Sequence, residues 1–240
     1  MSETTPGRMP TTEAPLQAGN VLESLRMRYV ESCPPDYEPG ASVDIFYSSD
    51  EFWTKFERWL REAPDFYPAS DKAFVESVVR VDGARAVNIG TYYPWAEIEW
   101  GARAAEWVGL DNNPHVVARA RDVLARFPGH RVTLIEADVT EPLELAGGFD
   151  FVLDLSTFDH LDPRRFDVIL DNYKRLSDRL VMAYDATRAP IVDYDFERCG
   201  FNARLNPATI AAMLEEVGYT IECHRPYAHE EYRSYILARL

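Results

Sequence analysis

From Ala84 onward, short apolar runs alternate with stretches that carry apolar residues at helical spacing. The apolar runs cover 84–90, 106–111, 131–138, 149–156 and 179–186. They are apolar throughout, which is typical of parallel strands buried on both faces. Between them, Asn113, Asp162 and Asn206 each precede a proline, the pattern of a capping side chain before the first helical residue. The alternation predicts an α/β fold with a doubly wound, mainly parallel sheet.

The end of the chain departs from this alternation. Two strand-like runs, 220–227 and 232–240, are separated by only four residues. A gap that short cannot hold a crossover helix, so the pair is expected to form an antiparallel hairpin. The predicted sheet therefore has seven strands, Rossmann-like, with one reversed strand near its end.

The chain divides by composition into three parts. Residues 1–20 are rich in Thr, Pro and Glu, and we expect them to be a disordered leader. Residues 21–80 are helical and aromatic in character and predict a small N-terminal cap that closes over the site. Residues 81–240 carry the α/β pattern and form the main domain.

Two helices are predicted inside this cap. The first begins at Ser49 or Asp50, because the residues that follow form one apolar helical face. That face consists of Phe52, Trp53, Phe56, Trp59 and Leu60. The second helix is expected to open at Ser70 or Asp71 and to end near Val81.

Composition narrows the partners and the compartment. The 240 residues carry a formal net charge of −15 and are 46% hydrophobic, as in an ordinary globular protein. An acidic surface repels phosphate backbones and anionic lipid, which argues against nucleic acid and membrane partners and favours a small molecule. The three cysteines stand far apart in the sequence, which favours a reducing compartment. We find no apolar run of membrane length and no signal pattern, so we expect a cytoplasmic protein.

Acidic residues stand at the predicted strand ends, where α/β sheets bind ligands. Asp111 ends the second strand, 21 residues after Gly90, and a carboxylate there suits the two hydroxyls of a ribose. Asp138 ends the third strand and could accept from the exocyclic amine of a purine. A single Asp in such a place is commonly only a turn or cap residue. Three such acids at neighbouring strand ends, namely Asp111, Asp138 and Asp154 on the fourth strand, favour a nucleoside site.

The chain resembles the class I S-adenosylmethionine-dependent methyltransferases from about residue 70 onward. The resemblance rests on AVNIG, GLD, EADV, FDFVLDLSTFDHL and LEEVGYTIE. It implies S-adenosyl-L-methionine as cofactor and methyl transfer to a small, partly apolar organic substrate. It also implies that the loop after the first strand contacts the methionine part of the cofactor. The acid after the second strand would then bind the ribose, and the acid after the third strand would bind the adenine amine. The implied cofactor-binding residues are Gly90, Thr91, Tyr92, Asp111, Asn112, Asp138, Val139, Asp154, Leu155 and Ser156.

The first loop departs from the family pattern. The family's G-x-G-x-G is replaced here by Gly90 followed by Thr, Tyr, Tyr, Pro94 and Trp, with one glycine. Because glycines let the backbone approach a ligand closely, this loop is expected to take another path. Pro94 is a natural start for a helix after the loop. The missing glycines argue more strongly against a nicotinamide dinucleotide, whose pyrophosphate requires that approach.

His160 is the leading candidate for catalysis. It follows the fourth strand, where a substrate would stand, and its ordinary pKa of about 6.5 suits a general base. Asp159 could orient His160 or act in its place. The alternative is that both residues form a turn before the cap at Asp162.

No metal is predicted. A magnesium site of the catechol type would require acids after strands four and five, with Asn beside the second. Asp154 and Asp185 are present, but Ala186 follows the latter, and the nearby Asp171-Asn172 pair falls within a helix.

A partly apolar small-molecule pocket is predicted from aromatic residues and from the segment 187–204, which has no clear periodicity. The aromatic residues are Tyr47, Phe52, Tyr92, Tyr93, Trp95, Tyr194, Phe196 and Phe201, of which Phe52 is expected in the core because it lies on a helical stripe. Two alternatives to a small-molecule methyltransferase stay open: a binding or regulatory protein that has lost catalysis, and an enzyme of this fold with different chemistry.

Overall fold

A computed structural model describes residues 21–32, 49–62, 67–187, 191–195, 200–229 and 233–240. The leader predicted for 1–20 lies outside these residues. So do Tyr47 and Phe196, and the side chains of Tyr194 and Phe201 are not described either.

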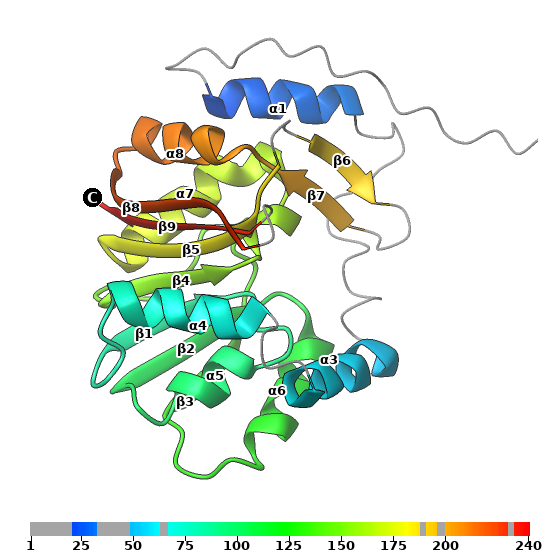
Figure 1. The fold of residues 1–240 in the computed structure, drawn as a ribbon, viewed down its shortest axis with the longest axis vertical. Helices are drawn as coiled ribbons and strands as arrows, with labels where there is room; N and C mark the ends of the chain where they lie inside the picture. The colour runs from blue at the N-terminus through cyan, green and yellow to red at the C-terminus, as the bar shows by residue number, and fades with distance from the viewer. Residues whose placement is uncertain (1–20, 33–48, 63–66, 188–190, 196–199, 230–232) are drawn as a thin grey trace, which may run out of the picture.

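The central element is a mainly parallel sheet, which confirms the predicted fold class (Figure 1). Its strands are β1 Arg85–Ile89, β2 Glu106–Asp111, β3 Val132–Glu136, β4 Phe151–Leu155, β5 Arg179–Asp185, β8 Thr220–His229 and β9 Arg233–Arg239. Their order is β3-β2-β1-β4-β5-β9-β8, and β1 to β5 are parallel. β9 runs antiparallel to both β5 and β8, so the predicted hairpin and the single reversed strand are confirmed.

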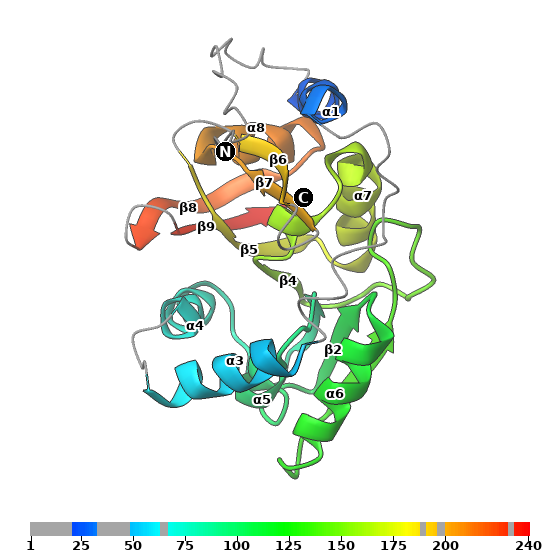
Figure 2. The same cartoon turned by 90° about the vertical axis from the view of Figure 1, so that its right-hand side faces the viewer.

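Helices cover both faces of this sheet (Figures 1 and 2). They are α1 Val21–Ser32, α3 Asp50–Glu62, α4 Tyr67–Val78, α5 Trp95–Trp100, α6 Pro114–Leu124, α7 Phe166–Leu176 and α8 Pro207–Glu216. One hydrophobic core joins the sheet to α1, α7 and α8, and the other joins it to α3, α4, α5 and α6. Side chains alternate between the two cores along each strand, as in Val152 and Leu153 of β4.

The predicted helix starts hold where a polar side chain caps the backbone. Asn113 accepts from the backbone N–H groups of the second and third residues after it, and Asn206 caps α8 in the same way. Asp162 caps as well, but it opens the short 3-10 helix η2, Pro163–Arg165, rather than an α-helix. The α-helix that follows begins only at Phe166, which corrects the predicted start.

The helix predicted to start at Ser70 or Asp71 begins earlier, at Tyr67, and ends at Val78. A proline in its first turn is compatible with this start, because that turn leaves its N–H groups unpaired in any case. Asp71 does not cap the helix. Its side chain is fully buried and pairs with Arg233.

The segment 187–204 contains regular structure that its sequence did not indicate. Two five-residue strands, β6 Ile191–Asp195 and β7 Gly200–Arg204, pair antiparallel as a separate small sheet. A bridge between Ala186 and Leu205 closes the base of this hairpin. The sequences of the two strands, IVDYD and GFNAR, carry polar residues within the run, so neither is the continuous apolar run that predicts a buried strand.

The helices of 21–80 lie on different faces of the sheet. α1 packs beside α8, β6 and η2, and the backbone N–H of Val21 donates to Glu216 Oε2 at 2.7 Å. α3 belongs to the opposite core and lies apart from α1 in both views (Figures 1 and 2). Whether either helix closes over a ligand stays a prediction.

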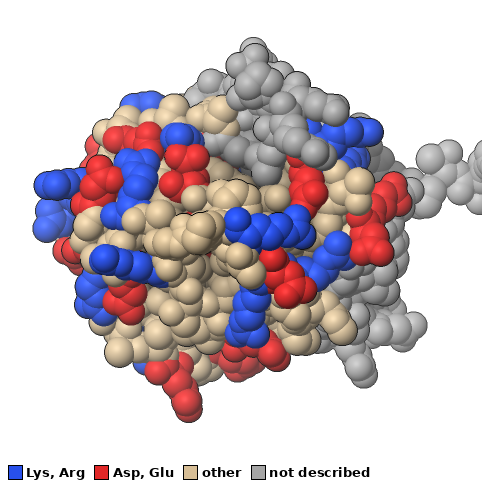
Figure 3. All heavy atoms as spheres, turned by 90° about the horizontal axis from the view of Figure 1, so that it is seen from below, with Lys and Arg blue, Asp and Glu red and all other residues tan. Residues whose placement is uncertain are grey.

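Charges of both signs are mixed on the surface. Figure 3 shows Lys and Arg interspersed with Asp and Glu on one face, without a large area of a single sign. Within the described residues, no helix combines the length and apolar character needed to cross a membrane.

Candidate functional site

The carboxyl ends of β1, β2 and β4 lie side by side at the centre of the sheet. Ile89 pairs in register with Leu110 on one side and with Asp154 on the other. Gly90 and Asp111, each one residue further on, are therefore neighbours, as the sequence predicted. The loops after β1 and β4 meet at this point, which makes it the centre of the candidate site.

Gly90 stands where these two loops touch. Its φ of +74° is left-handed, and its N–H donates to the Leu110 carbonyl oxygen at 2.8 Å. A Cβ on Gly90 would stand 2.0 Å from Thr157 Oγ1, which itself donates to the Ile89 carbonyl oxygen at 2.7 Å. This position therefore accepts only glycine, because a side chain would displace the loop after β4.

Asp111 fixes the loop after β1. Asp111 Oδ2 accepts from the backbone N–H of Tyr92 at 2.9 Å, and Oδ1 accepts from that of Asn113 at 3.0 Å. The carboxylate thus ties the loop to the start of α6, and Asn112 beside it is exposed. Since a carboxylate offers about four acceptor positions, Asp111 has the capacity to bind a diol as well.

Aromatic side chains of α3 pack against the loop after β1. Phe56 of α3 stacks on Tyr93, with 5.1 Å between ring centroids, and meets Tyr92 edge-on at 5.5 Å. Trp53 lies 5.3 Å from Tyr93. Tyr93 and Trp95 are buried, so these two predicted pocket residues belong to the core instead. Phe52 does too.

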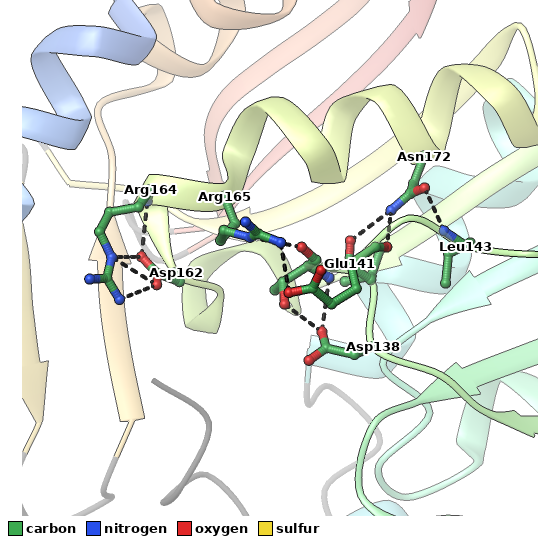
Figure 4. A network of polar contacts seen from close by, with 9 residues as sticks. Asp138, Glu141, Leu143, Asp162, Arg164, Arg165 and Asn172 are labelled. Atoms are coloured by element: carbon green, nitrogen blue, oxygen red, sulfur yellow. Dashed lines mark hydrogen bonds and ion pairs between the residues drawn. The ribbon is translucent and has the colours of Figure 1, made fainter. Parts of the chain in front are cut away.

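The segment after β3 is anchored on η2 and α7 (Figure 4). Asp138 Oδ1 accepts from the N–H and the hydroxyl of Thr140, at 2.8 and 2.7 Å. Arg165 donates to the Thr140 carbonyl oxygen at 2.9 Å, and Asn172 donates to the Val139 carbonyl oxygen at 2.9 Å. Asp138 is exposed while Val139 is buried. The predicted adenine-binding acid is thus presented on a rigid segment.

Asp154 is oriented inward. It is fully buried, and its Oδ1 accepts from the backbone N–H groups of Thr157 and Phe158 at 2.9 and 3.2 Å. Its Oδ2 accepts from the Tyr173 hydroxyl at 2.6 Å. Burial raises the pKa of Asp154 to about 6, against these hydrogen bonds. In this structure the Asp154 carboxylate fixes the loop that carries Ser156, and the cofactor contact predicted for Asp154 stays a prediction.

Ser156 is held by a buried ionic cluster. Its φ of +70° is left-handed, a strained conformation for a residue with a side chain, and Leu155 before it is buried. Arg233 Nη1 donates to the Ser156 hydroxyl and, at 3.2 Å, to Asp185. Arg233 Nε donates to Asp71 at 3.0 Å. Burial opposes the charge of Arg233, but Asp71 and then Asp185 raise its pKa well above the ordinary value, so it stays a cation.

The two predicted catalytic residues lie in the short 3-10 helix η1, Phe158–His160. Asp159 is buried, and its Oδ2 accepts from the Asp185 backbone N–H at 2.8 Å. Burial and then the charge of Asp185 raise the pKa of Asp159 well above its ordinary value. His160 is half-buried, and β7 lies against η1. The general-base role stays a prediction.

Sequence reasoning missed several residues that shape this site. Arg233 and Asp71 pair across 162 positions, and neither stands in a motif. Glu97 of α5 is fully buried, and burial raises its pKa to about 7 against a hydrogen bond from Asn88. For Glu97 the available signal was a charged residue between apolar neighbours, which marks a buried partner.

The described ranges offer no cluster of metal-binding side chains. No group of three His, Cys, Asp or Glu side chains in them is arranged to hold a metal ion. Asn172 lies within α7, as predicted, and its side chain serves the segment after β3.

Comparison with known proteins gives structural neighbours only. No family model matches the sequence, and no match was found among curated proteins. Among solved structures, the complex described as DhpI-SAM-HEP shares 12% identity at a TM-score of 0.63, covering 91% of this chain and 98% of that one. Magnesium protoporphyrin IX methyltransferase ChlM from Synechocystis PCC 6803, with bound SAH, shares 18% identity at a TM-score of 0.59, covering 82% and 97%.

A third neighbour is the glycopeptide N-methyltransferase MtfA complexed with S-adenosyl-L-methionine. It shares 15% identity at a TM-score of 0.57, covering 71% of this chain and 92% of that one. At such identities the likeness concerns the fold. The chain therefore has the fold of S-adenosylmethionine-dependent methyltransferases, as its sequence motifs predicted.

Proposed function

We propose that this protein is an S-adenosyl-L-methionine-dependent methyltransferase that acts on a small organic molecule. The observation that carries the proposal is the pairing of this fold with Asp111. The sheet, with its reversed β9, belongs to a fold that resembles solved methyltransferase structures. At the centre of the sheet, Asp111 stands at the end of β2 and accepts a hydrogen bond from the loop after β1. A nucleoside would lie at these strand ends.

The residues at the strand ends fit such a cofactor chemically. Asp111 offers acceptor positions for the ribose hydroxyls, and the exposed Asp138 offers an acceptor for an adenine amine. Below the loop, three buried oxygen atoms of Asn88, Thr91 and Glu97 have no partner among the described residues. Unsatisfied buried polar atoms are rare in folded proteins, so these three call for a further partner, such as a bound ligand or an ordered water.

The cofactor would supply an electrophilic methyl group, and the chain would supply position. Asp111 and Asp138 would hold the nucleoside, while the loops after β1 and β4 fix the distance between cofactor and acceptor. Methyl transfer depends mainly on such in-line placement. His160, beyond the end of β4, would take a proton from a hydroxyl or ammonium acceptor, a contribution of about 10²–10⁴-fold.

The substrate side is proposed at η1 and the β6–β7 hairpin. β7 lies against η1, which carries His160, and α1 lies against β6. These elements are additions around the sheet, and such additions commonly set substrate choice. The neighbours' names include a porphyrin and a glycopeptide, which supports an organic small molecule as the methyl acceptor in general terms.

Formation of S-adenosylhomocysteine tests the proposal. The full-length protein would be incubated with S-adenosylmethionine and a panel of phenols, amines and carboxylic acids. We expect product with one acceptor class, and His160→Ala should lower turnover by about 10²–10⁴-fold with unchanged cofactor affinity. The control is His115→Ala, an exposed residue on α6. Near-native turnover of His160→Ala would remove the general base and leave transfer by proximity.

One observation favours a second candidate, a binding protein without catalysis. The loop after β1 has one glycine, and Thr157 and the aromatic residues of α3 pack tightly against it. Such a protein would bind S-adenosylmethionine and transfer its methyl to no acceptor. The same assay, combined with a binding measurement, separates the two candidates.

A further inference from the structure

The guanidinium of Arg233 connects three separate elements at the carboxyl ends of β4 and β5. The Arg233 side chain is buried, and its Nε donates to Asp71 Oδ1 of α4 at 3.0 Å while Nη2 donates to Asp71 Oδ2. Nη1 donates to the Ser156 hydroxyl after β4 and, at 3.2 Å, to Asp185 Oδ1 at the end of β5. One edge of the guanidinium thus fastens α4, and the other meets the strand ends of the candidate site.

The pairing with Asp71 orients the guanidinium. Two parallel hydrogen bonds to one carboxylate fix the plane of an arginine head group, because both groups are planar. This plane sets the direction of Nη1. On that side, Ser156 has a left-handed φ of +70°, and its N–H donates to the Ala183 carbonyl oxygen at 2.7 Å. Fastening α4 requires only the Asp71 edge, so the contacts of Nη1 hold the loop after β4 and the end of β5.

Of the carboxyl groups that surround Arg233, Asp185 is the one that a ligand can reach. Asp71, Asp154 and Asp159 are buried, whereas the Asp185 side chain is 39% exposed. The Asp185 backbone N–H donates to Asp159 Oδ2 at 2.8 Å, which places Asp185 beside η1. Because η1 carries His160, Asp185 stands on the side of the site proposed for the methyl acceptor.

The negative charge of Asp185 is not balanced inside this cluster. Arg233 and the buried Asp71 form an ion pair that is neutral as a whole, and Arg233 is also the cation that meets Asp185. Burial and then the charge of Asp185 raise the pKa of Asp159 well above its ordinary value, so Asp159 holds its proton more readily. The surplus charge therefore lies on Asp185, where it attracts a cation and repels a carboxylate.

We propose that Asp185 binds an ammonium group of the methyl acceptor and that Arg233 is the positioning residue that aims the Asp185 carboxylate. The inference rests on the proposed function and names the class of its substrate, which is an amine and not a carboxylic acid. Arg233 does not contact the acceptor, because its donors are turned to Asp71, Ser156 and Asp185. Its effect on the acceptor passes through Asp185.

Three acceptors of similar size test the preference for charge. Near neutral pH, benzylamine is a cation, phenol is neutral and benzoate is an anion. The full-length protein would be assayed with S-adenosylmethionine and each acceptor for formation of S-adenosylhomocysteine. We expect kcat/KM to fall from benzylamine to phenol to benzoate, by at least about 10-fold between the first and the last. Binding of the three compounds to the S-adenosylhomocysteine complex, followed by nuclear magnetic resonance, should show the same order.

Two substitutions separate binding by Asp185 from positioning by Arg233. Asp185→Asn keeps the shape and removes the charge, so it should raise KM for benzylamine by roughly 10- to 100-fold and not that for benzoate. Arg233→Lys keeps a positive charge but lacks the fork that reaches Asp71 and Asp185 together, so it should raise the same KM. In the Asp185→Asn background, Arg233→Lys should add less than about 3-fold, because its effect passes through Asp185. Affinity for S-adenosylhomocysteine should stay within about 3-fold throughout, which also shows that the variants are folded.

The control is Asp178→Asn, in an exposed pair with Arg239 just before β5, which should behave as the native protein. Equal binding of benzoate and benzylamine, or a native KM in Asp185→Asn, overturns the role of Asp185. A full further loss from Arg233→Lys in the Asp185→Asn background overturns the positioning role and makes Arg233 structural only. If none of the three compounds is methylated, the proposed function fails, and their order of binding still decides the preference for charge.

Discussion

The loops after β1 and β4 touch at Gly90 and Thr157, yet different kinds of contact dominate in each. Aromatic rings of α3 pack on the first loop, with Phe56 stacked on Tyr93, and a single carboxylate, Asp111, accepts from its backbone. Buried charges and hydrogen bonds hold the second, with Asp154 and Arg233 as its anchors. The first loop should therefore respond to changes of shape, and the second to changes of charge. The carboxyls around both loops add a dependence on pH.

The largest expected effect is at Arg233. Arg233→Met leaves Asp71 buried without its partner, which typically costs about 3–5 kcal/mol of unfolding free energy. Urea unfolding measures it. The double variant Asp71→Asn with Arg233→Met should recover a large part of the loss, since it removes both charges. Arg239→Met, in the exposed pair with Asp178, should change little. A native-like Arg233→Met would contradict the charge-based account of the second loop.

The next largest effect is the pH dependence of the unfolding free energy that Glu97 causes. Its pKa is raised to about 7, so between about pH 4.5 and 7 the folded protein binds a proton that the unfolded chain has released. Stability supplied by this group is therefore lost as pH rises through that window, by about 3 kcal/mol. Glu97→Gln should lack this loss, and Glu99→Gln should retain it. Parallel stability curves for native protein and Glu97→Gln would show that Glu97 is not buried as described.

Tyr173 should have a smaller effect. Tyr173→Phe removes the hydroxyl that donates to Asp154 at 2.6 Å and leaves a buried carboxylate oxygen unpaired, at about 1–3 kcal/mol. The loss should shrink below about pH 6, where Asp154 becomes neutral. Tyr219→Phe is the matched control, because the buried Tyr219 hydroxyl has no partner in the described part of the chain. Equal losses in both variants would contradict the assigned role of Asp154.

The smallest effect is expected at Phe56. Phe56→Leu keeps an apolar side chain but removes the ring contacts with Tyr92 and Tyr93, for about 1 kcal/mol. The exposed Phe127→Leu should be neutral. Unlike Tyr173→Phe, this loss should be independent of pH. A pH-dependent loss would indicate that Phe56 acts on this loop through a titrating group and not through its ring contacts.

Local patterns were enough to predict the sheet and the place of the site. Strands β1 to β5 and the final hairpin follow from apolar runs and gap lengths, and Asp111 and Gly90 meet because parallel strands end at one edge. The role of Asp154 could not be predicted, because an acid at a strand end looks the same whether it faces a ligand or Tyr173.

The ion pair between Asp71 and Arg233 could not be predicted from the sequence either. Asp71 and Arg233 lie 162 residues apart, and only the fold brings them together. The β6–β7 hairpin was missed because its stability depends on pairing rather than on a pattern within each strand.

The most direct test of the central claim is calorimetric titration of the native protein and of Asp111→Ala with S-adenosylmethionine and with NAD. We predict that the native protein binds S-adenosylmethionine and not NAD. Asp111→Ala should bind it about 1–3 kcal/mol more weakly, because ribose hydroxyls lose their acceptor. Asp122→Ala, on the exposed face of α6, should bind as the native protein does. Unchanged affinity in Asp111→Ala, or binding of NAD instead, would contradict the account.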